Sequence, residues 1–242
     1  MKLALVTYPF VESYLKERRS IIIPIGSVEQ HCPVGLTGTD HLIAEEIAYQ
    51  VGENTGALVA PTMSYGMSNH HLGFPGTVSL NPRTLIAVII DVIDSLNRNG
   101  FKEFYFVNGH GGNVNPVLSA FSEITREKDI SCKIQSWWTM AEMMAFNEQA
   151  FGSEDGHHAT ASEISQTIYF YESRFELPLP SYSVEEKEHC WPLSPEGFMR
   201  EYPDGRMASN PGLASYEKGK EVFEKAVELI ERDFLDFERL GK

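Results

Sequence analysis

The stretch Ile21-Ile22-Ile23-Pro24-Ile25-Gly26-Ser27-Val28-Glu29-Gln30-His31 determines how the chain is organised. The apolar run 21–25 is short enough to be a buried strand. In extended backbone, side chains two positions apart point to the same side, so Glu29 and His31 would present an oxygen and a nitrogen to one point. A loop rich in Gly and Thr then leads to Asp40, which directly precedes a helical pattern over 41–51. Carboxylates and an imidazole that converge at a strand end are typical ligands of a divalent metal.

The same residues also fit structural roles. Asp is a frequent helix N-cap, so Asp40 could simply begin the following helix. Glu29 and His31 could be solvated loop residues, because short motifs often match by chance. The metal hypothesis therefore depends on the rest of the chain.

Strand, loop and helix alternate through the first 140 residues. Apolar runs predict strands over 21–25, 57–61, 104–107 and 130–138, and periodicity predicts helices over 9–18, 41–52, 83–98 and from the turn after His110 to about residue 128. This alternation predicts an α/β fold, a three-layer sandwich whose mostly parallel central sheet is flanked by helices. Ligands of such sheets bind at the carboxyl ends of the strands, where Glu29, His31 and His110 fall.

The second half of the chain has a less regular pattern. We expect a helix from about 160 to 171, an irregular stretch over 178–211 and a long charged helix over 214–240. The loop over 63–81 is long and rich in apolar residues, which is typical of functional loops. No repeat or linker interrupts the chain, so we expect a single domain over residues 1–242.

The composition excludes several classes of protein. The formal net charge of −14 argues against a nucleic-acid partner, because such proteins concentrate Lys and Arg. No apolar run approaches the ~20 residues that cross a bilayer, so no membrane partner is expected. The N-terminus does not resemble a signal peptide, and the three cysteines have no paired spacing. We therefore expect a protein of the reducing cytoplasm.

Three further residues in the chain suit proton or metal chemistry. His110 follows an apolar strand within Asn108-Gly-His-Gly-Gly-Asn113, where glycines let the backbone approach an ion or oxyanion. His158 titrates near neutral pH and suits a proton carrier, although a structural histidine is more common. Glu163 follows Thr160 with the spacing of a capping box, a purely structural alternative. The remaining histidine pair, His70 and His71, is less specific, and the adjacent Trp137 and Trp138 fit a strand end in the core.

Taken together, these motifs resemble the creatininase, or creatinine amidohydrolase, family. The matching segments are 26–31 with Gly38-Thr-Asp40, Phe74-Pro-Gly-Thr77, 108–113, 158–165 and Asn210-Pro-Gly-Leu-Ala-Ser215 with Lys218-Gly219. The likeness extends over about residues 5 to 235. It implies a three-layer α/β domain that holds one or two divalent ions.

The resemblance also implies roles for individual residues. Metal ligands of the family match Glu29, His31, Asp40, His110 and Glu163, with Asp40 able to bridge two ions. The histidine that assists proton transfer matches His158, and we expect Asp155 to orient it. We expect the substrate to contact His70, Gly111, Gly112 and Trp138. The family further implies a homo-oligomer, a hexamer.

The chain departs from creatininase proper in ways that bear on the substrate. A metal-binding glutamate of that enzyme is replaced by Gly112, and a tryptophan is replaced by Glu154. Cys32 and Val34 replace a glycine and a histidine that are common after the first motif. Creatinine is therefore a doubtful substrate.

We accordingly expect a metal-dependent hydrolase that uses metal-activated water on a non-peptide C–N bond in a small amide or formamide. Two alternatives remain: a peptide-trimming member of the family, or a non-catalytic protein that binds metal or senses a ligand. Mixed carboxylate and imidazole ligands suit zinc, manganese and iron alike.

Overall fold

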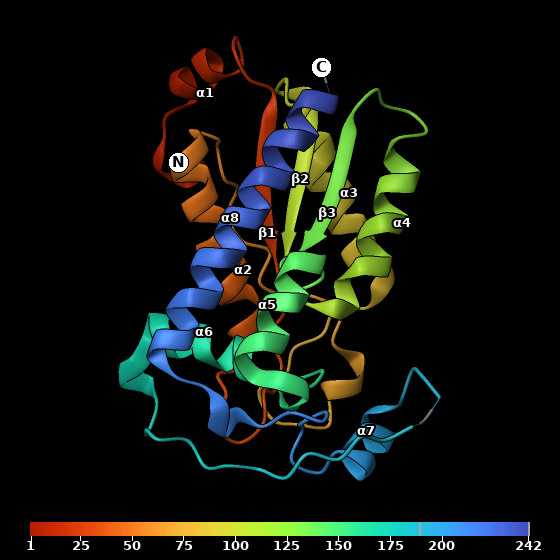
Figure 1. Cartoon of the computed structure of the whole chain (residues 1–242). Helices are drawn as coiled ribbons and strands as arrows, with labels where there is room; N and C mark the ends of the chain where they lie inside the picture. Colours follow the sequence, from red (N-terminus) through yellow and green to blue (C-terminus); the bar gives the residue numbers. More distant parts are fainter. Residues whose placement is uncertain (189, 242) are drawn as a thin grey trace.

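The computed structural model describes residues 1–188 and 190–241. Three parallel strands form the central sheet in the order β1 (Ser20–Ile25), β2 (Glu103–Asn108) and β3 (Ser131–Ser136). The register aligns the last residues of the three strands with one another. The chain therefore leaves all three at one edge, toward which the strand arrows in Figure 1 point.

The strand predicted over 57–61 is not a regular strand, and this prediction is wrong in its detail. The segment still runs beside β1, since Ala60 N–H donates to the Ile22 carbonyl and Met63 N–H to the Pro24 carbonyl. The acceptors Ile22 and Pro24 are two positions apart, whereas the donors Ala60 and Met63 are three positions apart. One extra residue therefore bulges out of the ladder on the donor side. Pro61 lies within this bulge and has no N–H to donate, which explains the interruption.

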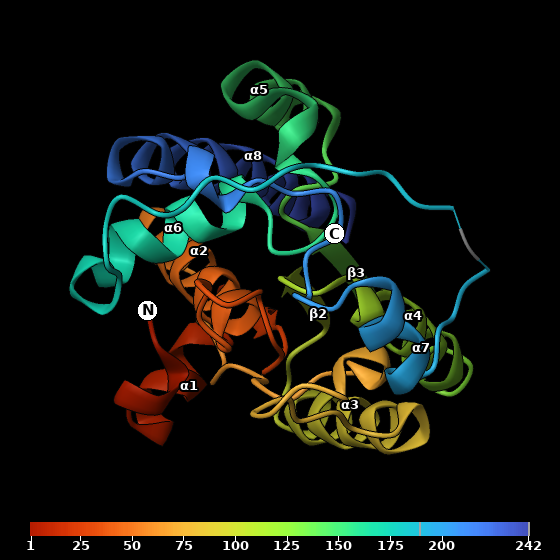
Figure 2. The same ribbon diagram turned by 90° about the horizontal axis from the view of Figure 1, so that it is seen from below.

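Helices cover both faces of the sheet, which confirms the three-layer α/β prediction. One face packs against α2 (Thr39–Thr55) and α8 (Tyr216–Leu240), with α5 (Ala141–Phe151) and α6 (Ala161–Tyr171) beside them; the other packs against α3 (Pro82–Arg98) and α4 (Val114–Ile124). Figure 2 shows these two groups on opposite sides of the strands. Alternation in β1 sends Ile22 into the first core and Ile21 and Ile23 into the second.

Several helix boundaries differ from the predicted ones. The first helix, α1, covers only Tyr8–Tyr14, and α4 ends at Ile124 rather than near residue 128. No element was predicted where α5 lies, nor for α7 (Pro195–Glu201) within the stretch 178–211. Ser194 caps α7 and Pro195 occupies its first turn, which are ordinary start signals hidden by the Pro-rich surroundings. Among the helices of the described ranges, none is both long and apolar enough to cross a membrane.

Candidate metal centre

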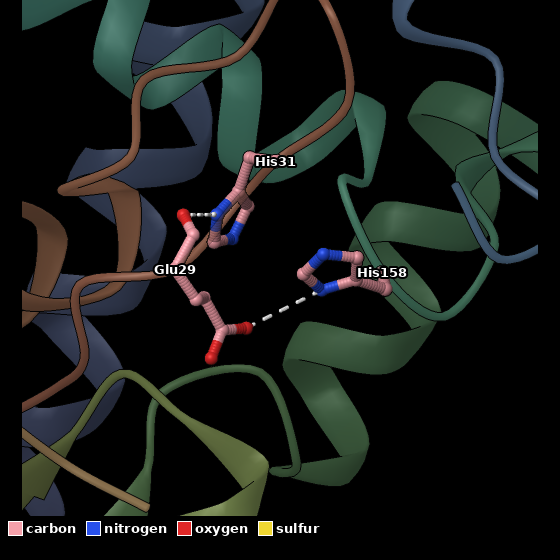
Figure 3. A group of neighbouring side chains, drawn as sticks. All are labelled: Glu29, His31 and His158. Atoms are coloured by element: carbon pink, nitrogen blue, oxygen red, sulfur yellow. Dashed lines mark hydrogen bonds and ion pairs between the residues drawn. The ribbon is translucent and has the colours of Figure 1, made fainter. Parts of the chain in front are cut away.

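Five candidate ligands from separate segments meet at the carboxyl edge of the sheet. Glu29 and His31 lie in the loop after β1, Asp40 lies in the first turn of α2, and His110 follows β2. Glu163 lies in the first turn of α6. Their side chains are almost completely inaccessible to solvent except that of Glu163, which is partly accessible. Figure 3 shows Glu29 and His31 next to His158.

The approach of β2 to α2 depends on a glycine. A Cβ atom at Gly109 would lie 2.0 Å from the Asp40 carbonyl oxygen, far inside van der Waals contact. Only a residue without a side chain therefore lets the loop that carries His110 reach the helix that carries Asp40.

Asp40 is not the N-cap of α2, because Gly38 occupies that position. The two carboxylate oxygens of Asp40 face two different imidazoles. Oδ1 lies 2.9 Å from Nε2 of His31, and Oδ2 lies 2.9 Å from Nδ1 of His110. Such a carboxylate can offer one oxygen to each of two neighbouring cations.

The ligand atoms fall into triads, within each of which all atoms lie within 4.8 Å of one another. One triad contains Glu29, Asp40 and His110, and a second contains His31, Asp40 and Glu163. Both triads share Asp40. A further triad joins Glu29, His31 and His158.

Three imidazoles in the cluster have the same orientation. In each ring, one nitrogen lies near the carboxylates (the inner nitrogen) and the other (the outer nitrogen) lies near a backbone carbonyl oxygen. The outer nitrogens and their carbonyls are Nδ1 of His31 with Glu29 O at 3.2 Å, Nε2 of His110 with Met67 O at 3.0 Å, and Nε2 of His158 with Gln30 O at 2.8 Å. Because a carbonyl only accepts, the outer nitrogen carries the proton and the inner nitrogen of a neutral ring presents a lone pair. Metal-ligating histidines are commonly held in this way.

The inner nitrogens face carboxylates, which identifies a site suited to a cation. Nε2 of His31 lies 2.9 Å from Asp40 yet forms no hydrogen bond of acceptable geometry with any described residue. Ser27 Oγ lies 2.9 Å from Glu29 Oε2 and 2.7 Å from Asp40 Oδ2, and its single hydrogen can be donated to either carboxylate. Among the described residues, the groups that could hold a metal contain only His, Asp and Glu, and such nitrogen and oxygen donors fit zinc, manganese or iron.

The ionisation of the cluster reflects the same need for positive charge. Burial would raise the pKa of Glu29, but His110 and His71 outweigh it and hold this pKa well below its usual value. Burial lowers the pKa of His31, but Asp40 more than offsets it, to a net value of about 9. Burial also lowers the pKa of His110, and Glu29 and Asp40 reverse this to a value well above the usual one. Without a metal, protons on these imidazoles balance the carboxylates.

Glu163 forms the predicted capping box, and its carboxylate also lies close to two of the other predicted ligands. Its Oε2 accepts a hydrogen bond from Thr160 N–H at 2.9 Å, and its own N–H donates to Thr160 Oγ1, which completes a capping box. The same carboxylate belongs to the triad with His31 and Asp40. Burial raises the pKa of Glu163 to about 7 although His31 opposes the shift.

The expected proton carriers have different environments. Burial and the nearby His31 lower the pKa of His158 to about 4, so the ring is neutral at pH 7. Its Nδ1 lies 3.6 Å from Glu29 Oε1. Asp155 contacts Ser162 instead of His158: it accepts hydrogen bonds from Ser162 N–H at 2.8 Å and Ser162 Oγ at 2.9 Å. Burial raises the pKa of Asp155 to about 6.

A cavity of about 740 Å³ opens onto the cluster. The four residues expected to contact substrate all line it: His70, Gly111, Gly112 and Trp138. A Cβ atom at Gly112 would lie 2.2 Å from the Met67 carbonyl oxygen, so this position is packed for glycine. Among the described residues that line the cavity there is no Lys or Arg.

Sequence reasoning missed two residues of this site. His71 lies between Glu29, at 3.3 Å from Nε2, and Gln30, at 3.0 Å from Nδ1. The sequence predicts a substrate contact for His70 only, and no local feature distinguishes the two histidines. The position of Gln30 between Glu29 and His31 is the one signal in the sequence that points to it.

This fold and this buried set of carboxylates and imidazoles define a metal-dependent hydrolase. The family model for creatininase, described as creatinine amidohydrolase, matches residues 4–233. The chain therefore belongs to the creatininase family of amidohydrolases.

Known relatives agree with this assignment. The chain is 27% identical to a 3-dehydro-scyllo-inosose hydrolase from Thermotoga maritima, over 98% of this chain and 84% of the relative. It is 38% identical to a mycofactocin precursor peptide peptidase from Mycolicibacterium smegmatis, over only 44% of this chain and 45% of the relative. A crystal structure of creatininase superimposes with a TM-score of 0.82 at 24% identity, covering 96% of this chain and 95% of that one, which confirms the fold.

Proposed function

We propose that this protein hydrolyses the C–N bond of a small, uncharged amide or formamide at a divalent-metal centre. The observation that carries the proposal is the pair of triads that share Asp40. Glu29, Asp40 and His110 would hold one ion, and His31, Asp40 and Glu163 a second. Zinc, manganese or iron held there would polarise the substrate carbonyl and lower the pKa of water from ~16 toward ~7.

His158 is the proposed proton carrier. Its ring is neutral at pH 7 and its Nδ1 bears a lone pair directed toward the cluster. Nδ1 would take the proton of the attacking water as the C–O bond forms, and would return it to the leaving nitrogen as the C–N bond breaks. Asp155, with a pKa near 6, lines the same cavity and could exchange protons with solvent, while its hydrogen bonds to Ser162 fix the start of α6.

The lining of the cavity supports an uncharged substrate. No cationic side chain is present among the described lining residues, so no Lys or Arg of the lining would pair with a phosphate or carboxylate group of a substrate. The backbone N–H groups of Gly111 and Gly112 would stabilise a developing oxyanion, and Trp138 and His70 would contact the body of the substrate.

A second candidate is hydrolysis of a cyclic polyol ketone. The Thermotoga maritima relative is named for such a substrate, and the likeness to it extends over 98% of this chain. The likeness to the peptide-trimming relative covers less than half of the chain, so that function has weaker support.

The test is a substrate panel on metal-loaded protein. Formamides, lactams, short peptides and 3-dehydro-scyllo-inosose would be incubated with enzyme reconstituted with Zn²⁺ or Mn²⁺. Release of amine or ammonia with formate or another acid is expected. Turnover of the ketone alone would replace the amide proposal with the second candidate. Full metal occupancy without turnover on any compound would favour a non-catalytic metal-binding protein.

We also propose that residues 1–242 act as one domain in the cytoplasm and assemble into a homo-oligomer, a hexamer by family resemblance. The three unpaired cysteines suit a reducing compartment. The exposed apolar side chains of Leu5, Tyr8 and Phe10 near the N-terminus support an interface. Light scattering at micromolar concentration should detect the oligomer, and a monomer would exclude it.

A further inference from the structure

Gln30 connects several segments around the metal centre. Its side chain is buried, and its Oε1 accepts a hydrogen bond from the backbone N–H of Cys32 at 2.8 Å. Because a backbone N–H can only donate, this bond fixes which end of the amide is oxygen and which is nitrogen.

The amide nitrogen of Gln30 has three polar neighbours but only two hydrogens to donate. Nε2 lies 2.9 Å from the Gly205 carbonyl oxygen, 3.0 Å from Nδ1 of His71 and 2.9 Å from Nε2 of His158. A primary amide carries two hydrogens, so two of these atoms accept and one does not. The Gly205 carbonyl can only accept and therefore takes one hydrogen.

His158 cannot take the other hydrogen. Its Nε2 also lies 2.8 Å from the backbone carbonyl of Gln30, which only accepts, so this nitrogen must carry a proton of its own. The second amide hydrogen of Gln30 is thus donated to Nδ1 of His71.

This leaves His71 in the opposite orientation to the three histidines described above. Its Nδ1 accepts the hydrogen of the Gln30 amide and so carries no proton, which leaves the ring neutral. The single proton is then on Nε2, which lies 3.3 Å from Oε1 of Glu29. In their neutral forms, His31, His110 and His158 direct a lone pair toward the carboxylates, whereas neutral His71 directs an N–H toward Glu29.

We propose that Gln30 is a positioning residue that fixes His71 as the Nε2-protonated tautomer, so that His71 donates a hydrogen bond to Glu29 and orients this carboxylate for the metal. His71 therefore does not bind the metal itself but hydrogen-bonds to Glu29, which does. The three histidines that face backbone carbonyls are the ones whose neutral rings direct a lone pair into the site. The inference rests on the proposed metal centre for its function, but the tautomer itself does not require a metal.

The first experiment measures the tautomer directly in the wild-type protein. Long-range ¹H–¹⁵N correlation spectra of metal-free protein labelled with ¹⁵N-histidine at pH 7, assigned through bonds, should give His71 an unprotonated Nδ1 and a protonated Nε2. A protonated Nδ1 in His71 would overturn the inference. This measurement needs no substitution and so does not depend on how well a variant folds.

The second experiment measures the affinity for Zn²⁺ by competition with a chelator. Loss of an outer partner of a metal ligand typically weakens binding ~10–100-fold. We expect a weakening of this size in Gln30→Met and in His71→Ala, and no larger weakening in the double variant than in His71→Ala, because Gln30 acts through His71. The matched control Gln50→Met, on an exposed face of α2, should bind Zn²⁺ like the wild type.

The outcomes separate the two proposals. If the wild type binds no divalent metal, the proposed metal centre fails, whatever the tautomer. If the wild type binds metal but His71→Ala binds equally well, or if the two single effects simply add, the positioning role is wrong. If His71→Ala loses metal altogether, His71 is itself a ligand and the inference is also wrong.

Discussion

Two buried groups of charged side chains lie at opposite edges of the sheet and are built differently. At the amino edge, the Arg18 guanidinium contacts both carboxylate oxygens of Glu238, at 2.6 and 2.5 Å, and donates to the Thr55 carbonyl at 2.7 Å. At the carboxyl edge, Glu29, Asp40 and Glu163 cluster with imidazoles and no Lys or Arg among the described cavity-lining residues.

These two groups show how a structural charge group is distinguished from a functional one. A guanidinium is always charged and satisfies a carboxylate bidentately, so the amino-edge group is complete within the chain. The carboxyl-edge group is balanced only when protons occupy its imidazoles, or when a cation replaces them. A buried acidic cluster that depends on titratable partners is therefore the better candidate for a metal centre.

The largest effect should follow removal of a ligand. His110→Ala should lower Zn²⁺ affinity by more than the ~100-fold typical of outer partners, because an inner nitrogen of the cluster disappears. Metal content after dialysis, measured by atomic emission, should drop together with activity. His157→Ala, which removes an exposed histidine paired with Glu186, should keep its metal. Full metal content in His110→Ala would contradict the assignment of the carboxyl-edge group as the metal centre.

The next effect separates proton transfer from metal binding. His158→Ala should reduce turnover by ~10²- to 10⁴-fold, the usual contribution of acid–base assistance, with metal content unchanged. Since Nδ1 of His158 also lies 3.6 Å from Glu29, loss of metal in this variant would instead identify a ligand. Near-normal turnover would exclude both roles.

The amino-edge group should affect stability alone. Arg18→Met leaves the mostly buried Glu238 carboxylate without its guanidinium, and we expect a loss of about 3 kcal/mol in the free energy of unfolding. Urea unfolding should detect the loss while Zn²⁺ affinity stays the same. A parallel drop in metal affinity would mean that the two edges are coupled.

The smallest expected effect is a gain in stability of the metal-free protein instead of a loss. Glu163→Gln preserves the capping box, because glutamine serves equally well at its third position. The folded-state pKa of Glu163, about 7, lies above the ordinary value of 4.5, so the ionised carboxylate destabilises the metal-free fold as pH rises from about 4.5 through 7.

Metal-free Glu163→Gln should therefore be more stable than wild type at pH 8, by on the order of 1–3 kcal/mol. The gain should vanish near pH 4, where the wild-type carboxyl is protonated. Thermal melts at both pH values provide the measurement. The same variant should bind Zn²⁺ more weakly, and unchanged affinity would leave Glu163 with the capping role alone.

The layers of the fold could be predicted from local patterns in the sequence. Periodicity located β1, β2, α3 and α8, because alternation and helical spacing are local properties of the chain. The interruption at Pro61 and the short helix α7 were not predicted, although Pro61 lacks an N–H and Ser194 and Pro195 are ordinary start signals, because short local signals are ambiguous in Pro-rich surroundings. Parallel strands predicted that Glu29, His31 and His110 lie at one edge, whereas Glu163 entered the predicted ligand set through the family resemblance; the fold brings all five candidates together.

Only the tertiary structure decided what each polar group does at that edge. The sequence left Glu163 as either cap or ligand, and the fold gives its carboxylate both environments. Likewise, nothing local separates His70 from His71. The difference arises because Gln30, 41 residues before His71, donates to His71 and lies in a different loop. A proton's position on a ring depends on atoms that are near in space and distant along the chain, so no local pattern could contain it.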